Sequence, residues 1–197
     1  MVNRSLRSAL RQATRKAHER LEGLLALDRS DAGYRERYVV FLRSMGAVHL
    51  PIERLLLSDP AYCDAITDAP QRRRAGCTLS DLDALGAPPP ADDARLPSIA
   101  SLGAKLGVAY VFEGATLGGR VLSAKVLEHV PEGQAATAYV TGYGERTPIM
   151  WRRFIAALDA TSLDERGHRD ALDATKMTFA LLTERAETEL ALAESER

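Results

Sequence analysis

The sequence predicts an all-α protein in which residues 1–197 form a single domain. Apolar residues recur at helical spacing along most of the chain, as in amphipathic helices. We find no run of alternating β-branched residues bounded by turn dipeptides, which would indicate a strand. One proline-rich loop, residues 86–97 (GAPPPADDARLP), interrupts the helical pattern. We therefore expect roughly six to eight helices around one core.

The first part of the chain contains four expected helices, over residues 5–27, 32–57, 61–69 and 72–85. The first helix has an apolar stripe that it can bury, formed by Leu6, Leu10, Ala13, Ala17, Leu21 and Leu24. Ser30 or Asp31 can cap the second helix, and Asp59-Pro60 ends it. Three arginines open the fourth helix at residues 72–74, and we expect them to form a solvated face.

The second part continues with three expected helices, over residues 98–130, 148–160 and from the cap at residue 162 to about residue 195. Ser98 is expected to cap the first of these. Pro148 suits the first turn of the second, because an N–H is not needed there. Ser162, followed three residues later by Glu165, forms a capping box for the last helix.

Composition and charge exclude several classes of protein. The formal net charge is −1, so no overall attraction to nucleic acid or to an anionic membrane is expected. No apolar run approaches the ~20 residues of a membrane span, and the N-terminus lacks the apolar segment of a secretory signal. The two cysteines, Cys63 and Cys77, form no CxxC pair and no disulfide framework. We expect a cytoplasmic protein of bacterial type.

A row of glycines is the most unusual feature of the expected helix 98–130. Gly103, Gly107, Gly114 and Gly118 fall within roughly a 60° arc of one face, at ~100° per residue. Gly119 lies beside this row, and Tyr110 shares its stripe. Each glycine in a helix interior costs about 1 kcal/mol relative to alanine. Another helix or a large flat ligand must therefore approach this backbone closely.

His18 is the candidate ligand-binding residue of the first expected helix. It lies at the edge of the apolar stripe, and Arg15 and Arg11 occupy the same face one and two turns earlier. Imidazole is a good ligand for iron, zinc or copper, and guanidinium pairs with carboxylates or phosphates. A flat apolar ligand with a central metal and carboxylates on its rim would use all three residues. A half-buried structural histidine is the alternative interpretation.

Other chemical motifs are absent from the sequence. No HxxxH, HExxH or paired CxxC spacing indicates a zinc site. There is no G-x-S-x-G, and residues 114–119 follow no strand and lack the Lys-Thr or Lys-Ser of a phosphate loop. His49, His129 and His168 are weaker candidates, which we assign to packing, to a helix end and to an exposed stretch.

Three segments resemble the heme oxygenase family in helix order and length. LRQATRKAHERLEGLLA in the first helix is similar to the family's proximal helix, which carries a histidine after L-x-x-A-T-x-x-x. Residues 110–122 (YVFEGATLGGRVL) resemble the distal helix, and in this version they look like the heme oxygenases associated with bacterial phytochromes. Residues 151–159 (WRRFIAALD) resemble a later helix of the family.

The resemblance implies a role for each matching residue. His18 would be the proximal iron ligand, and Arg11, Arg15 and Arg152 would pair with the heme propionates. The distal helix would pass over the heme at Gly114, Gly118 and Gly119, with a kink at the last two. Phe179 matches an aromatic residue at the heme edge, and Tyr110 is offset by one position from a family tyrosine near the propionates. Gly103 and Gly107 have no counterpart, so we expect them to pack against a neighbouring helix.

The chain departs from the family pattern at one position. Many heme oxygenases carry an aspartate just after the first distal glycine, where it orders the water that protonates bound oxygen. Here that residue is Ala115, and Thr116 follows it. The hydroxyl of Thr116 is the expected substitute for orienting a water.

The activity that the resemblance implies is oxidative cleavage of heme, which is both substrate and cofactor. The reaction would use O2 and external electrons, and would release biliverdin, carbon monoxide and ferrous iron. A separate reductase or ferredoxin-type protein would donate the electrons, and a bacteriophytochrome could receive the biliverdin.

Two alternatives stay open at this point. One is a heme-binding carrier or sensor without oxygenase activity, which Ala115 favours. The other is a helical protein whose glycine row only packs against another helix, with a role in interaction or in thiamin-type chemistry. Uptake of hemin, followed by addition of a reductant, separates all three.

Overall fold

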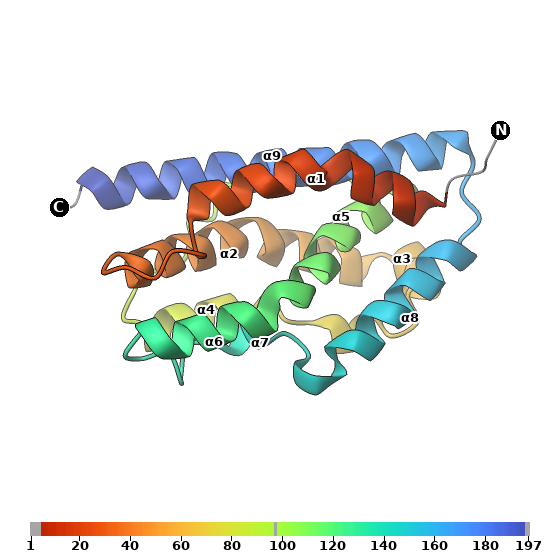
Figure 1. The fold of residues 1–197 in the computed structure, drawn as a ribbon. Coiled ribbons are helices and arrows are strands. Elements are labelled where there is room, and N and C mark those ends of the chain that lie inside the picture. Colours follow the sequence, from red (N-terminus) through yellow and green to blue (C-terminus); the bar gives the residue numbers. More distant parts are fainter. Residues whose placement is uncertain (1–4, 97, 196–197) are drawn as a thin grey trace.

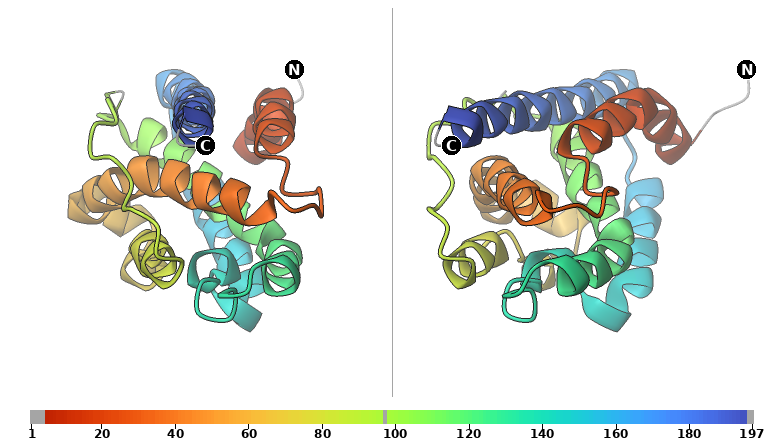
Figure 2. Two further views of the ribbon diagram at one scale, coloured as in Figure 1. Left: turned by 90° about the vertical axis from the view of Figure 1, so that its left-hand side faces the viewer. Right: turned by 60° about the vertical axis from the view of Figure 1, so that its left-hand side comes forward.

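The computed structural model describes residues 5–96 and 98–195, which form helices, turns and loops without a strand. The helices α1 (Leu6–Leu25) and α9 (Glu165–Ser195) lie side by side along one edge of the molecule (Figures 1 and 2). The central helix α2 (Tyr34–Ser58) lies below them. The expected all-α fold is confirmed.

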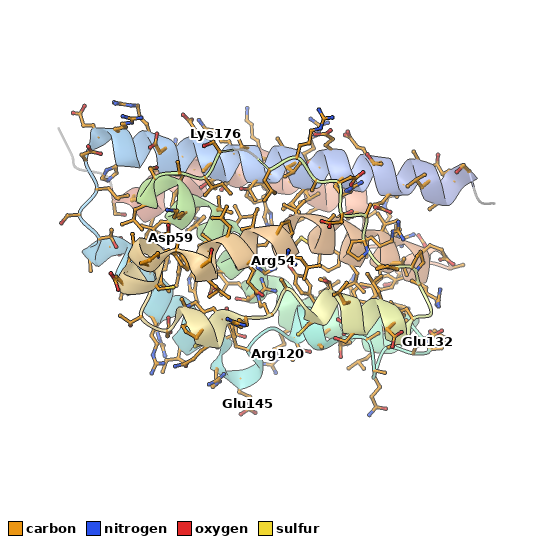
Figure 3. All side chains as sticks on the ribbon, turned by 180° about the vertical axis from the view of Figure 1, so that it is seen from behind. Arg54, Asp59, Arg120, Glu132, Glu145 and Lys176 are labelled. Atoms are coloured by element: carbon orange, nitrogen blue, oxygen red, sulfur yellow. The ribbon has the colours of Figure 1, made fainter. Side chains whose placement is uncertain are left out.

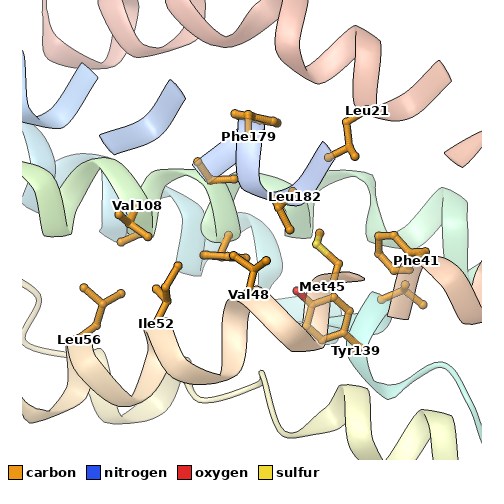
Figure 4. Packing of buried hydrophobic residues seen from close by; sticks show 14 of the residues in the cluster. Leu21, Phe41, Met45, Val48, Ile52, Leu56, Val108, Tyr139, Phe179 and Leu182 are labelled. Atoms are coloured by element: carbon orange, nitrogen blue, oxygen red, sulfur yellow. The ribbon is translucent and has the colours of Figure 1, made fainter. Parts of the chain in front are cut away.

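The helix α2 carries much of the core. Val48, Ile52 and Leu56 point from it toward Val108 of α5 and Leu182 of α9, and all five side chains are buried (Figure 4). The helix is unbroken through Pro51. Its burial on several sides agrees with the few polar residues between positions 38 and 52.

The segment after α2 differs from the expected helices 61–69 and 72–85. The structure has α3 (Pro60–Ala65), a 3-10 turn η1 (Ala69–Arg72) and α4 (Cys77–Ala84). The chain leaves helical geometry at Arg73, whose ψ is 119°. Arg72 and Arg74 on either side point into the interior, so the expectation of a solvated arginine face is wrong for these two residues. Arg73 alone is exposed.

The glycine-rich segment forms two helices joined by a tight turn. They are α5 (Leu102–Ala115), the 3-10 turn η2 (Thr116–Gly118) and α6 (Gly119–His129). This is the expected kink, because a 3-10 turn in a helix changes its direction. The N-cap of α5 is Ser101, whose side chain accepts from the N–H of Ala104, and not Ser98.

The first two glycines of the row allow α5 to touch α9 backbone to backbone. A Cβ at Gly103 would overlap the carbonyl of Gly167, and one at Gly107 would overlap the carbonyl of Ala171. The Thr175 hydroxyl also donates to the Gly107 carbonyl at 2.9 Å. The predicted packing role of Gly103 and Gly107 is thereby confirmed.

The last part of the chain crosses the opposite edge of the molecule and then returns to α1. It comprises α7 (Ala138–Thr141), a 3-10 turn η3 (Gly144–Arg146) and α8 (Thr147–Ala160) at that edge, followed by α9 beside α1 (Figure 1). Pro148 lies in the first turn of α8, as expected. At the start of α9 the Asp164 carboxylate accepts the N–H of Gly167 at 2.7 Å, so Asp164 makes the capping contact that we expected of Ser162.

The surface agrees with the near-neutral charge. Charged side chains of both signs are spread over the back of the molecule, among them Arg54, Glu132 and Lys176 (Figure 3). Among the described helices, none is both long and apolar enough to cross a membrane.

We predict that Gly107→Ala destabilises the protein by about 1–3 kcal/mol, because the added methyl group forces α5 away from α9. The control is Gly23→Ala in α1, where a Cβ meets nothing within 4 Å. That variant should be about 0.5–1 kcal/mol more stable than the wild type, because alanine is the better helix former. Urea denaturation measures both, and equal effects of the two substitutions would contradict the α5–α9 contact.

Candidate functional site

The second half of the glycine row faces open space instead of another backbone. A Cβ at Gly118 would meet nothing within 4 Å, and one at Gly114 would meet only the Trp151 ring, at 4.0 Å. Leu117 and Val121 on the same helix pair are 51% and 68% exposed. A bare backbone flanked by exposed apolar side chains is a surface suited to a flat apolar ligand.

Gly119 lies in a different environment from Gly114 and Gly118. A Cβ there would overlap the carbonyl oxygen of Val140 in α7. Gly119 is buried, and its lack of a side chain lets α6 pack against α7. Gly119 therefore does not share the open environment of Gly114 and Gly118, and its expected role over the heme stays a prediction.

Thr116 also points away from the open surface. It is buried, its hydroxyl donates to the Glu113 carbonyl at 2.7 Å, and its Cβ lies near Gly142. The expected water-orienting role of Thr116 stays a prediction that this placement does not favour.

His18 lies on α1, which packs against α9 and also contacts α8. Its side chain is 53% exposed, and the Phe179 ring of α9 meets it edge-on with the ring centroids 5.9 Å apart. The Glu22 carboxylate lies 3.2 Å from Nδ1. Such a carboxylate can orient an imidazole by accepting the Nδ1 proton. This contact of Glu22 with His18 was not predicted, although the i+4 spacing of the two residues on one helix indicates it.

The predicted arginines lie on two helices, α1 and α8, which contact each other. Arg11 and Arg15 on α1 and Arg152 on α8 are exposed. Burial raises the pKa of the Tyr110 hydroxyl on α5, while the charges of Arg7 and Arg11 oppose that rise.

Trp151 on α8 borders the exposed surface around Gly114 and Gly118, which we call the opening. Its ring lies 5.7 Å from that of Tyr110 and next to the bare Cα of Gly114. Trp151 is the single tryptophan of the chain. The sequence analysis quoted this residue only as part of the segment 151–159 and gave it no role.

Behind the open face lies a buried set of polar side chains. Arg72 donates to Glu113 at 2.6 Å, and the Tyr143 hydroxyl donates to the same carboxylate at 2.7 Å. Arg74 donates to the Phe112 carbonyl. A cavity of about 30 Å³ adjoins these groups and is also lined by His49, Glu53 and Tyr62. Because that volume exceeds one water probe and several polar atoms face it, the cavity can hold an internal water.

The exposed imidazole on α1 and the exposed glycine face at the kink between α5 and α6 are the two features of this all-α protein that suit a flat ligand. Residues 4–188 match the family model described as heme oxygenase, so the chain belongs to the heme oxygenase family.

Two further comparisons agree with this family. A heme oxygenase of Xanthomonas campestris pv. campestris (strain 8004) is 35% identical over 109 residues, which are 55% of this chain and 64% of that protein. The match therefore spans less than two thirds of that relative. The structure is also similar to that of the NO- and CO-bound heme oxygenase from Neisseria meningitidis, with a TM-score of 0.80, 20% identity, and coverage of 95% of this chain and 92% of that one. At this identity the similarity shows a shared fold.

We predict that His49 makes the protein less stable at mildly acidic pH. Burial, and then the charge of Arg74, hold the pKa of His49 well below 6.5. The ring stacks on Phe112 at 3.9 Å, and Nδ1 lies 3.1 Å from the Tyr139 hydroxyl. The Glu53 carboxylate, 4.0 Å from Nε2, is too far for a hydrogen bond. Stability present above the unfolded-state pKa is therefore lost as the pH falls below it.

The expected loss is at most about 1.4 kcal/mol per pH unit below about pH 6.5. Urea denaturation of the wild type and of His49→Gln at several pH values above and below about 6.5 measures it. The free energy of unfolding of the variant should depend less steeply on pH. His168→Gln, at a half-buried position near the start of α9, is the control and should keep the wild-type slope. Equal slopes for all three proteins would show that His49 does not titrate as proposed.

Proposed function

We propose that this protein is a heme oxygenase that binds heme between α1 and the open side of α5 and α6. With O2 and electrons from a separate donor, it would convert the heme to biliverdin, carbon monoxide and ferrous iron. The observation that supports this most strongly is the combination of a half-exposed, carboxylate-oriented His18 with the bare backbone at Gly114 and Gly118. Membership of the heme oxygenase family gives that combination its chemical meaning.

The residues of the opening fit a heme. The imidazole of His18 can ligate iron through Nε2, because Glu22 occupies the Nδ1 side. The exposed side chains of Leu117 and Val121 offer apolar contact to a ring face, and Phe179 supports the imidazole from behind. The bound heme iron would supply the oxygen-activating chemistry.

The arginines would orient the substrate. Arg11, Arg15 and Arg152 are exposed, and guanidinium groups bind carboxylates in a defined bidentate geometry. Pairing with the two propionates would fix the rotation of the ring about its own axis. That rotation decides which edge of the ring lies against Gly114 and Trp151.

A heme carrier or sensor is the second candidate function. Ala115 favours it, because the described part of the open face carries no carboxylate next to Gly114, and Thr116 is turned away. The buried carboxylate of Glu113 lies one residue before Gly114 but is held by Arg72 and Tyr143.

The partners are part of the proposal. We propose a separate reductase or a ferredoxin-type protein as the electron donor. Delivery of biliverdin to a bacterial phytochrome rests on the resemblance of residues 110–122 and stays a prediction, as does the cytoplasmic location.

We predict that His18→Ala removes the histidine-ligated heme spectrum. The other histidines lie elsewhere: His49 is buried in α2, His129 ends α6 and His168 lies near the start of α9. Hemin titration followed by absorbance of the Soret band measures this. His168→Ala removes a half-buried histidine near the start of α9 and should keep the wild-type spectrum. An unchanged Soret band in His18→Ala would show that the iron ligand is another residue.

We also predict that Gly118→Leu strongly reduces biliverdin formation, because the side chain would occupy the space that the ring and O2 need. Gly76→Leu is a matched control, since Gly76 likewise has nothing within 4 Å of its Cβ position. Single-turnover formation of biliverdin with ascorbate measures both. A wild-type rate in Gly118→Leu would rule out close approach of the ligand at this glycine.

A further inference from the structure

Arg72 is a buried arginine whose guanidinium group contacts three different parts of the chain. Its Nε and Nη2 atoms lie 2.7 and 2.9 Å from the two oxygens of Asp68, one turn earlier. Its Nη1 donates to the Glu113 carboxylate of α5 at 2.6 Å, and its Nη2 also donates to the Met150 carbonyl of α8 at 3.1 Å. The Phe154 ring of α8 lies 5.6 Å from the guanidinium carbon.

The residues that Arg72 contacts are the immediate neighbours of the residues that border the opening. Glu113 precedes Gly114, and Met150 precedes Trp151. A Cβ added at Gly114 would lie 4.0 Å from the indole ring of Trp151, so these two residues are neighbours. One planar group therefore links the α5 wall and the α8 wall of the opening from behind.

The chemistry of Arg72 suits a role in spacing. The fork of a guanidinium has a fixed geometry, whereas a lysine ammonium is a single point charge on a flexible stem. A buried ion pair contributes little net stability compared with apolar residues of similar volume, because both charges lose their hydration. We therefore interpret the buried pair of Arg72 and Glu113 as a source of conformational specificity.

We propose that Arg72 is a positioning residue that sets the separation between Gly114 and Trp151. Its effect on the ligand rests on the proposed function: the separation of these walls limits which edge of the heme fits between them. Arg72 itself does not contact the ligand. It acts through Glu113 on α5 and through the Met150 carbonyl on α8.

The first test needs no ligand, because Trp151 is the single tryptophan. In Arg72→Lys the protein without heme should show a red-shifted Trp151 emission maximum and stronger quenching by acrylamide, since the indole is no longer held against Gly114. The control is Arg43→Lys. Arg43 of α2 also donates to a buried carboxylate, that of Glu189, and to the carbonyl of Pro88. Its carboxylate partner lies in the C-terminal part of α9. Arg43→Lys should keep the wild-type emission.

The second readout is the product. In Arg72→Lys the proportions of the biliverdin isomers should differ from those of the wild type, while Arg43→Lys gives the wild-type proportions. A purely structural role of Arg72 would lower the yield and leave the isomer proportions unchanged.

The outcomes separate this inference from the proposed function. Wild-type emission and wild-type isomer proportions in a folded Arg72→Lys would overturn the positioning role. Absence of bilin from the wild-type protein would overturn the proposed function, and the fluorescence would still decide the role of Arg72. If Arg72→Lys shows no cooperative thermal unfolding, Glu113→Gln replaces it, because this change keeps the side-chain shape and removes the charge that Arg72 binds. It should then show the same red shift, and wild-type emission would count against the inference.

Discussion

The backbone contact between α5 and α9 is the constraint on which the rest of the structure depends. Gly103 and Gly107 bring α5 so close to α9 that no other residue type fits. The same helix face continues to Gly114 and Gly118, where it turns toward open space. Because α1 packs against α9 as well, one long helix fixes both the candidate proximal and the candidate distal wall. The glycine face thus packs against α9 in its first half, and we propose that a ligand approaches its second half.

Hydrogen bonds to the buried carboxylate of Glu113 fix the end of α5 that borders the opening. The 3-10 turn η2 begins directly after α5, and the residue before Gly114 is anchored by Arg72 and Tyr143. Arg74 adds a hydrogen bond to the Phe112 carbonyl. These contacts fix the last turn of α5 while α6 beyond the kink keeps several exposed residues. A rigid wall beside a more exposed helix agrees with a site that admits a large substrate.

Much of the fold could be predicted from the sequence, because helical periodicity and capping are local. The helix order follows from spacing, and the resemblance to the heme oxygenase family added the kink near Gly118 and the packing role of Gly107. The burial of Arg72 could not be predicted, since its partners Glu113 and Met150 lie 41 and 78 residues away. The role of Trp151 and the direction of Thr116 depend on the same long-range placement. His18 was identifiable because its candidate chemistry and its arginines share one helix face.

A hemin titration of the purified protein, followed by ascorbate in air, tests the heme oxygenase proposal most directly. We predict stoichiometric uptake with a Soret band, which then bleaches as a red-absorbing bilin band appears. A Soret band that persists after the reductant would indicate a carrier or sensor and contradict the oxygenase activity. Absence of stoichiometric heme uptake would contradict the heme site between α1 and the open face of α5 and α6.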